Sequence, residues 1–185
     1  MLKQILKDAE TRMHKAVEVV RTELTKIRTG KATTALLDAV RVDYYGTMTP
    51  LQQVGSVSVP DVHLLTITPW DKGMLTNIEK AILTANLGLN PSNDGTVVRV
   101  PIPPLNEERR KELVKLIKKF GEEGKIAIRN IRRDINEHLK KSEKKEHFSE
   151  DERKRGEQEV QKYTDHHIKE VDNLLALKEK EIMEV

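Results

Sequence analysis

Helical spacing at the amino end of the chain is the feature that most restricts its fold. Apolar residues recur every three or four positions from Leu2 to Ile27, which is the spacing of one face of an α-helix. The segment predicts one long helix that ends at Thr29-Gly30, because glycine readily adopts the left-handed conformation that stops helices. A helix with one narrow apolar stripe needs partners that cover it.

The carboxyl-terminal part of the chain supplies two such partners. Asn106 can cap a helix with an acidic first turn. Its apolar positions are Leu113, Ile117, Phe120, Gly124, Ile128, Ile131, Ile135 and Leu139. After a break at His147-Phe148, Ser149 and Glu152 have the spacing of a capping box that opens a last helix. Its apolar positions are Gly156, Val160, Tyr163, His167, Val171, Leu174 and Ile182.

Composition agrees with elongated helices that share a narrow core. Charged residues make up 34% of the chain and hydrophobic residues only 37%, whereas about 25% charged residues is typical. The first helix would be about 40 Å long and the one from Asn106 about 55 Å. The simplest arrangement is a discontinuous three-helix bundle, in which residues 1–29 pack with residues 105–185.

Residues 30–104 have a different texture. Short β-branched or aromatic runs, bounded by proline and glycine, predict strands near 41–45, 54–59, 64–68 and 96–102. One helix lies among them, with Asp71 as its cap and an apolar face of Met74, Leu75, Ile78, Ile82 and Leu83. This segment is predicted to be a small α+β insertion, and the two short crossings at Thr29-Gly30 and Pro103-Pro104 are predicted to form a hinge.

Several kinds of site and segment are not expected. The absence of cysteine excludes disulfides and thiolate metal sites, and the six histidines lack the spacing of ligands on one helical face. The glycine-containing segment 88–95 lacks the Gly-Lys-Ser/Thr pattern of a phosphate loop. No known order of catalytic serine, histidine and acid appears. We therefore expect no metal, no cofactor and no enzymatic activity, and a cytoplasmic protein without a signal peptide or membrane span.

The charges are unevenly distributed along the chain. The formal net charge is +3, with five basic and six acidic residues between 31 and 104, so the positive excess belongs to the helical part. On the helix from Asn106, a basic stripe lies beside the apolar positions and consists of Lys111, Lys118, Lys125, Arg129 and Arg132. This stripe could bind a phosphate backbone, or it could be a solvated face paired with acids one turn away. The pattern alone leaves both interpretations open.

Long ordered stretches of the sequence resemble the ribosome recycling factor family. These stretches are IRTGKATTALLD (27–38), VDYYG (42–46), PLQQVGSVSVPD (50–61), LGLNPSNDGTVVRVPIPPLNEERRKEL (87–113) and EEGKIAIRNIRRDI (122–135). The resemblance implies an L-shaped α+β protein, with an elongated three-helix bundle, an inserted β/α/β domain and a two-stranded hinge. It also implies a function, which is to split the post-termination ribosome into subunits together with elongation factor G and GTP.

The resemblance implies that the bundle lies on large-subunit ribosomal RNA near the peptidyl-transferase region. The family's RNA-contacting arginines correspond to Arg28, Arg110, Arg129 and Arg132, whereas Lys31 stands where the family usually has arginine. Combined with the stripe and its edge, the expected RNA-binding set is Arg28, Lys31, Arg110, Lys118, Lys125, Arg129, Arg132 and Arg133. The expected hinge set is Thr29, Gly30, Pro103, Pro104 and Leu105.

We expect a monomer. The alternative from another functional class is a non-enzymatic helical-bundle adaptor or chaperone-like binding protein, which would account for the helices and the charge without any RNA.

Overall fold

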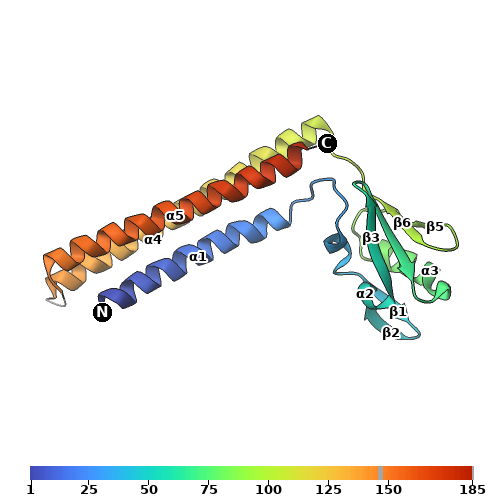
Figure 1. The fold of residues 1–185 in the computed structure, drawn as a ribbon, viewed down its shortest axis with the longest axis horizontal. Coiled ribbons are helices and arrows are strands. Elements are labelled where there is room, and N and C mark those ends of the chain that lie inside the picture. The colour runs from blue at the N-terminus through green and yellow to red at the C-terminus, as the bar shows by residue number, and fades with distance from the viewer. Residues whose placement is uncertain (146–147, 185) are drawn as a thin grey trace. The chain divides into compact units, whose positions relative to one another are not determined.

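The computed structural model describes residues 1–145 and 148–184, which form two compact units. One unit combines Met1–Arg28 with Asn106–Val185, and the other is the continuous segment Thr29–Leu105. All strands of the described residues belong to the second unit (Figure 1). The predicted divisions, after residues 29 and 104, each differ by one residue from these boundaries. The predicted fold class, a long helical bundle combined with a small sheet-containing insertion, is confirmed.

The first unit consists of three helices. They are α1 (Leu2–Thr25), α4 (Glu107–Lys144) and α5 (Glu150–Met183). α1 and α5 run in the same direction and α4 runs opposite to both (Figure 1). No helix among residues 1–145 and 148–184 combines the length and the apolar character needed to cross a membrane.

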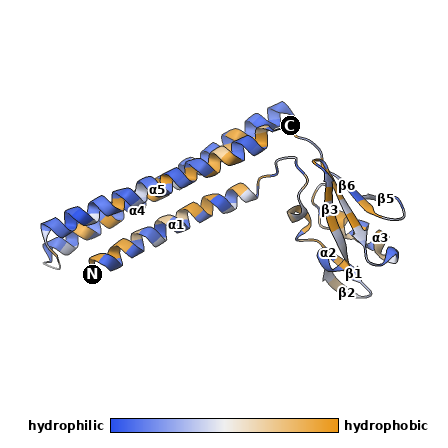
Figure 2. Cartoon of the chain, in the orientation of Figure 1, coloured by the Kyte–Doolittle hydropathy of each residue, from blue (hydrophilic) through white to orange (hydrophobic). Residues whose placement is uncertain are grey.

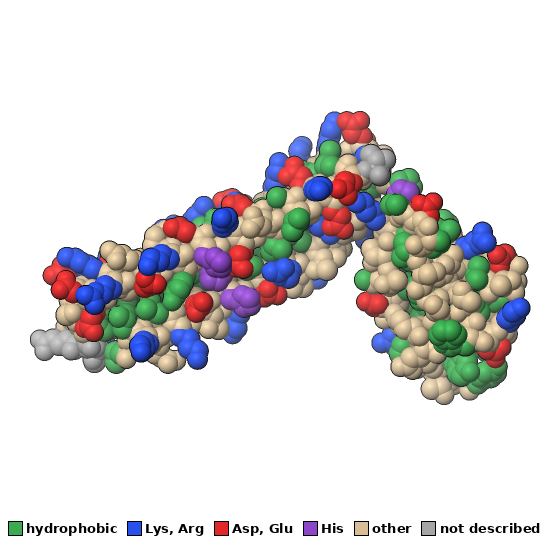
Figure 3. Space-filling model, viewed as in Figure 1, with side chains coloured by type: hydrophobic (Ala, Val, Ile, Leu, Met, Phe, Trp, Pro, Cys, Tyr) green, Lys and Arg blue, Asp and Glu red, His purple; other side chains and the backbone are tan. Residues whose placement is uncertain are grey.

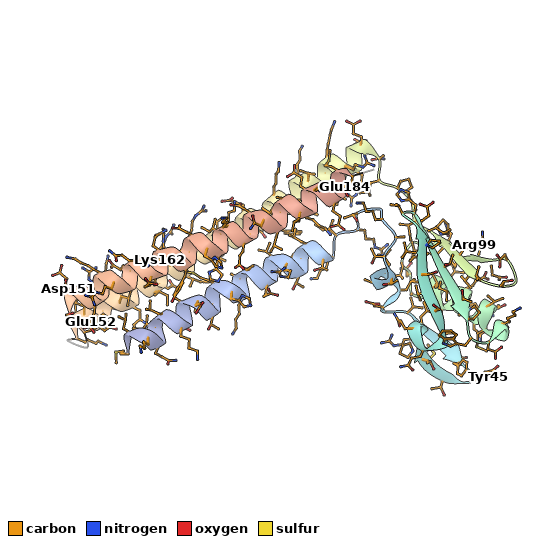
Figure 4. All side chains as sticks on the ribbon, viewed as in Figure 1. Tyr45, Arg99, Asp151, Glu152, Lys162 and Glu184 are labelled. Atoms are coloured by element: carbon orange, nitrogen blue, oxygen red, sulfur yellow. The ribbon has the colours of Figure 1, made fainter. Side chains whose placement is uncertain are left out.

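The predicted helix starts are confirmed. The Asn106 side chain accepts a hydrogen bond from the N–H of Arg109 at 2.7 Å, and α4 begins at the next residue after this cap. Ser149 and Glu152 form the complete capping box, in which each side chain accepts from the other's backbone N–H. Glu152 lies at the start of α5 (Figure 4). These local contacts satisfy backbone donors that a helix start leaves without partners. His147, in the predicted break between the two helices, lies outside the described residues.

The predicted end of the first helix is wrong. α1 ends at Thr25, and Gly30, with a φ of +74°, belongs to the second unit. The following residue, Lys26, keeps α-helical torsions, so no left-handed residue stops the helix. The left-handed glycine therefore shapes the linker and not the helix end.

Each of the three helices has a row of buried, mostly apolar residues along its length. Figure 2 shows hydrophobic residues recurring among hydrophilic ones along these helices. These rows differ in detail from the predicted apolar positions. Phe120, Ile131, Tyr163 and Leu174 are only half-buried, whereas Gly121 and Thr164 are buried. Each helix touches two others, so its buried face is wider than a single stripe.

Glycines allow the helices of the bundle to approach closely. A Cβ atom added at Gly124 of α4 would lie 2.3 Å from Cγ2 of Val20 on α1. Val20 is 2% exposed, and a β-branched side chain in a helix has essentially one favoured rotamer. Val20 therefore cannot easily move aside, and the glycine is needed for packing.

We predict that Gly124→Ala destabilises the bundle by about 1–3 kcal/mol, because overpacking outweighs the roughly 1 kcal/mol by which alanine favours a helix over glycine. The measurement is chemical denaturation followed by circular dichroism at a helical wavelength. Val20→Ala removes the obstructing methyl groups. The double variant should therefore lose less stability than the two single losses added together. Simple additivity would contradict this explanation of the contact.

The second unit is built on a four-stranded antiparallel sheet and a two-stranded hairpin. The sheet has the order β3-β4-β6-β5, and β1 pairs with β2. The bounds are β1 Arg41–Tyr44, β2 Thr47–Pro50, β3 Gly55–Asp61, β4 Leu64–Pro69, β5 Ser92–Asn93 and β6 Val98–Pro101. The four predicted strands correspond to β1, β3, β4 and β6, and the short β2 and β5 were not predicted.

Helical elements complete the core of this unit. They are η1 (Thr34–Leu37), α2 (Leu51–Val54), η2 (Lys72–Met74) and α3 (Leu75–Thr84). The predicted cap Asp71 accepts a hydrogen bond from the Gly73 N–H, so it starts the 3-10 turn that leads into α3. A hydrogen bond from the Tyr45 hydroxyl and the one from Gly73 lower the pKa of Asp71. Leu83, predicted on the buried face of α3, is instead 57% exposed.

Candidate RNA-binding face and linker

Three residues of the basic stripe of α4 lie along the edge that faces α5. Lys118, Lys125 and Arg132 are spaced seven residues apart, so they return to the same side of the helix. Their partners, Glu179, Asp172 and Gln161, all belong to α5. If the stripe were only a solvated face, its cations would pair with acids one turn away on α4 itself. Within the stripe only Lys111 does so, with its Nζ 2.9 Å from Glu107 Oε1.

The two lysines of this series are held to different degrees. Lys125 Nζ lies 2.5 Å from Asp172 Oδ1, and the lysine side chain is only 19% exposed. Lys118 Nζ lies 3.9 Å from Glu179 Oε1, and its side chain is 63% exposed. The ammonium group of Lys125 is therefore held by its ion pair within the bundle, whereas most of the Lys118 side chain remains accessible to a ligand.

The arginines retain more donor capacity than Lys125. Arg129 Nη1 lies 3.4 Å from Glu122 Oε1, and Arg132 Nη1 donates to Gln161 Oε1 at 3.1 Å. Each guanidinium has five N–H donors, so these single contacts leave forked pairs for a phosphate. Within the described part of the chain, the guanidinium groups of Arg110 and Arg133 have no hydrogen-bond or ion-pair partner.

The expected RNA-binding residues do not form a single cluster. Lys118, Lys125, Arg129, Arg132 and Arg133 share one stretch of α4, and Arg110 lies about 33 Å from Arg132 along the helix axis. Arg28 is exposed at the end of the first segment of the bundle unit, and Lys31 is half-buried in the other unit. Figure 3 shows acidic side chains interspersed with basic ones along the bundle face in view. The positive surface is thus a discontinuous row of cations.

No metal centre accompanies these residues. Across residues 1–145 and 148–184, no group of three or more His, Cys, Asp or Glu side chains could hold a metal ion.

The linker segments of the second unit meet at the turn between β3 and β4. His63 Nδ1 donates to the Gly30 carbonyl at 2.8 Å, and the His63 carbonyl accepts from the Ile102 N–H at 2.7 Å. The neighbouring Val62 carbonyl accepts from the Ala32 N–H at 2.6 Å. This turn therefore binds the chain where it enters the insertion and where it leaves it. Sequence reasoning missed His63, because a single histidine in a turn carries no spacing that marks it.

The predicted hinge residues all fall inside the second unit, at its two ends. Gly30 is buried, Thr29 and Leu105 are half-buried, and Pro103 and Pro104 are exposed. A Cβ atom at Gly30 would lie 3.0 Å from the Leu105 backbone nitrogen and 3.1 Å from its Cγ. The two linker segments thus touch closely at a position whose left-handed torsion and tight contact both favour glycine.

We predict that Gly30→Ala destabilises the insertion more than Gly88→Ala does. Both glycines have left-handed torsions, φ +74° and +70°, which cost a side-chain-bearing residue about 1–2 kcal/mol. A Cβ at Gly30 would also press against Leu105, whereas nothing lies within 4 Å of a Cβ at Gly88. Denaturant unfolding followed by fluorescence of Trp70, the only tryptophan, measures both losses. Equal losses would show that the contact with Leu105 contributes nothing.

Known proteins match this chain over nearly its whole length. The family model described as Ribosome recycling factor matches residues 20–183. A curated protein of Symbiobacterium thermophilum named Ribosome-recycling factor is 58% identical over 185 residues, and the alignment covers 100% of both chains.

Two solved structures are also similar. A solution structure of a ribosome recycling factor has a TM-score of 0.77 and 46% identity, covering 100% of this chain and 98% of that one. The second describes models for the T. thermophilus ribosome recycling factor and the E. coli elongation factor G bound to the E. coli post-termination complex. It has a TM-score of 0.63 and 47% identity, and the match covers 100% of both chains.

Proposed function

Because this chain belongs to the ribosome recycling factor family, we propose that it acts with elongation factor G and GTP to release ribosomes from mRNA after termination, by splitting the post-termination complex into subunits. The observation that carries the proposal is the full-length match to a recycling factor described, together with elongation factor G, as bound to that complex. Both units of this chain take part in the match, so the proposal covers the whole molecule.

The bundle is the part of the chain suited to holding ribosomal RNA. α4 is 38 residues long, which corresponds to about 57 Å of rigid helix. Cations on such a helix keep fixed spacings, and phosphate contacts fix the register of a protein on its nucleic acid. We assign the RNA contact near the peptidyl-transferase region to Arg28, Arg110, Lys118, Arg129, Arg132 and Arg133, with Lys31 contributing charge from the insertion. Lys125 is the weakest member of the expected set, because Asp172 already holds it.

We further propose where the energy for splitting comes from and where the chain bends. The chain would catalyse no reaction itself, and GTP hydrolysis by elongation factor G would drive splitting in the cytoplasm. The protein would act as a monomer whose linker residues, from Thr29 to Gly30 and from Pro103 to Leu105, act as the hinge. The hydrogen bonds of Val62 and His63 with Gly30, Ala32 and Ile102 support this, because they anchor the insertion at these positions and leave bending to the torsions at and beyond Gly30 and Ile102.

The direct test is light scattering of post-termination ribosomes mixed with this protein, elongation factor G and GTP. We predict that scattering falls as subunits separate, and that it stays constant when any one of the three is omitted. The alternative, a helical-bundle adaptor or chaperone-like protein, predicts constant scattering in the complete mixture.

A second test separates the residues of the basic stripe. We predict that Arg132→Ala weakens binding to the large subunit and lowers the salt dependence of the affinity by about one phosphate contact. Lys125→Ala, a change on the same face, should have a smaller effect because its ammonium group is paired with Asp172. Equilibrium binding at several salt concentrations measures both quantities. An unchanged affinity and slope for Arg132→Ala would remove this residue from the RNA contact.

A further inference from the structure

The contact between Arg132 and α5 differs from its neighbours in one chemical respect. Glu179, Asp172 and Asp165 of α5 are spaced seven residues apart, like Lys118, Lys125 and Arg132 on the antiparallel α4. The first two acids face the two lysines directly. At the third level, the side chain that bonds the cation is an amide, Gln161, and the acid bonds the amide.

The Gln161 amide is oriented by both of its partners. Its Oε1 accepts from Arg132 Nη1 at 3.1 Å, and its Nε2 donates to Asp165 Oδ1 at 2.8 Å. Turning the amide over would place the NH₂ group against the guanidinium and the oxygen against the carboxylate, which removes both hydrogen bonds. Asp165 therefore determines which end of Gln161 faces Arg132.

A neutral acceptor affects the guanidinium differently from a carboxylate. A carboxylate would neutralise Arg132 and compete with an incoming phosphate, as Asp172 does at Lys125. The amide restrains the guanidinium through Nη1 but leaves its positive charge. Among residues 1–145 and 148–184, Arg132 has no second hydrogen-bond partner, so its Nε–H and Nη2 donors remain for another ligand. Those two donors form a planar fork that matches two oxygens of a phosphate.

We propose that Gln161, held in orientation by Asp165, is a positioning residue that aims the Arg132 guanidinium at a backbone phosphate of ribosomal RNA while leaving its charge intact. The inference rests on the proposed RNA contact of the bundle. It assigns to α5 a part in that contact, although Gln161 itself touches no RNA. It also explains why Arg132 and Lys125, on the same face of α4, differ in their capacity for phosphate.

The experiment compares substitutions at Gln161 in the full-length protein, using large ribosomal subunits as the binding partner. Gln161→Glu places a carboxylate against Arg132, so the affinity should fall on the order of tenfold and the salt slope by about one contact. Gln161→Met keeps the length but removes the hydrogen bonds, so the affinity should fall about two- to threefold with the slope unchanged. Gln158→Glu is the matched control, since it adds the same charge to an exposed position of the same helix.

The double variant Arg132→Ala/Gln161→Glu isolates the coupling between the two residues. If Gln161 acts through Arg132, adding Gln161→Glu to Arg132→Ala should cause no further loss beyond that of the Gln158→Glu control. Circular dichroism melting of each variant checks that the bundle is folded, and Gln161→Met adds no charge that could destabilise α5.

The outcomes distinguish this inference from the proposed function. A normal affinity and slope for Arg132→Ala would overturn the RNA contact at Arg132, and the positioning role with it. A weakened Arg132→Ala together with wild-type binding of both Gln161 variants would overturn the positioning role alone. Equal losses for Gln161→Glu and Gln158→Glu, with no loss for Gln161→Met, would assign the effect to overall charge and would also overturn it.

Discussion

Mutual burial of the apolar faces of three long helices is the constraint on which the rest of the structure depends. α1, α4 and α5 are rich in charge and would be marginal as isolated helices, because most helical stability in proteins comes from packing. One of the three precedes the insertion and two follow it. The chain must therefore leave the bundle and return to it, which gives the insertion two connections. Close packing between the helices further demands small residues, as at Gly124 against Val20.

A narrow core places charged residues at the edges of every helix pair. Some of these side chains reach the neighbouring helix, as Arg12 of α1 does to Asp134 of α4. The series Lys118, Lys125 and Arg132 meets α5 in this way, and each member has a different partner. Surface pairs of this kind contribute little to stability, about 0–1 kcal/mol. Under the proposed RNA contact, their main consequence would be to set which cations keep donors for a phosphate.

The two connections of the insertion show a related division of roles. Two backbone hydrogen bonds to Val62 and His63, and one from the His63 ring to the Gly30 carbonyl, fix the linker segments within the insertion's own fold. Gly30 and Leu105 touch so closely that a side chain at the glycine would push against the Leu105 backbone. If the linker acts as the proposed hinge, these contacts leave only a few residues at the ends of the insertion to bend.

Much of the architecture was determined by the sequence itself, because it depends on local rules. Helical spacing, the cap at Asn106, the capping box at Ser149 and the β-branched runs act within a few residues, so the elements and the fold class followed from them. The family also followed, from long ordered stretches of residues. Tertiary structure decided the features that join distant parts of the chain: the burial of Gly121, the exposure of Leu83, the role of His63, and the partners of Lys125 and Arg132 on α5. Spacing along one helix shows which side chains share a face, but which residue of a neighbouring helix lies opposite is set by packing register.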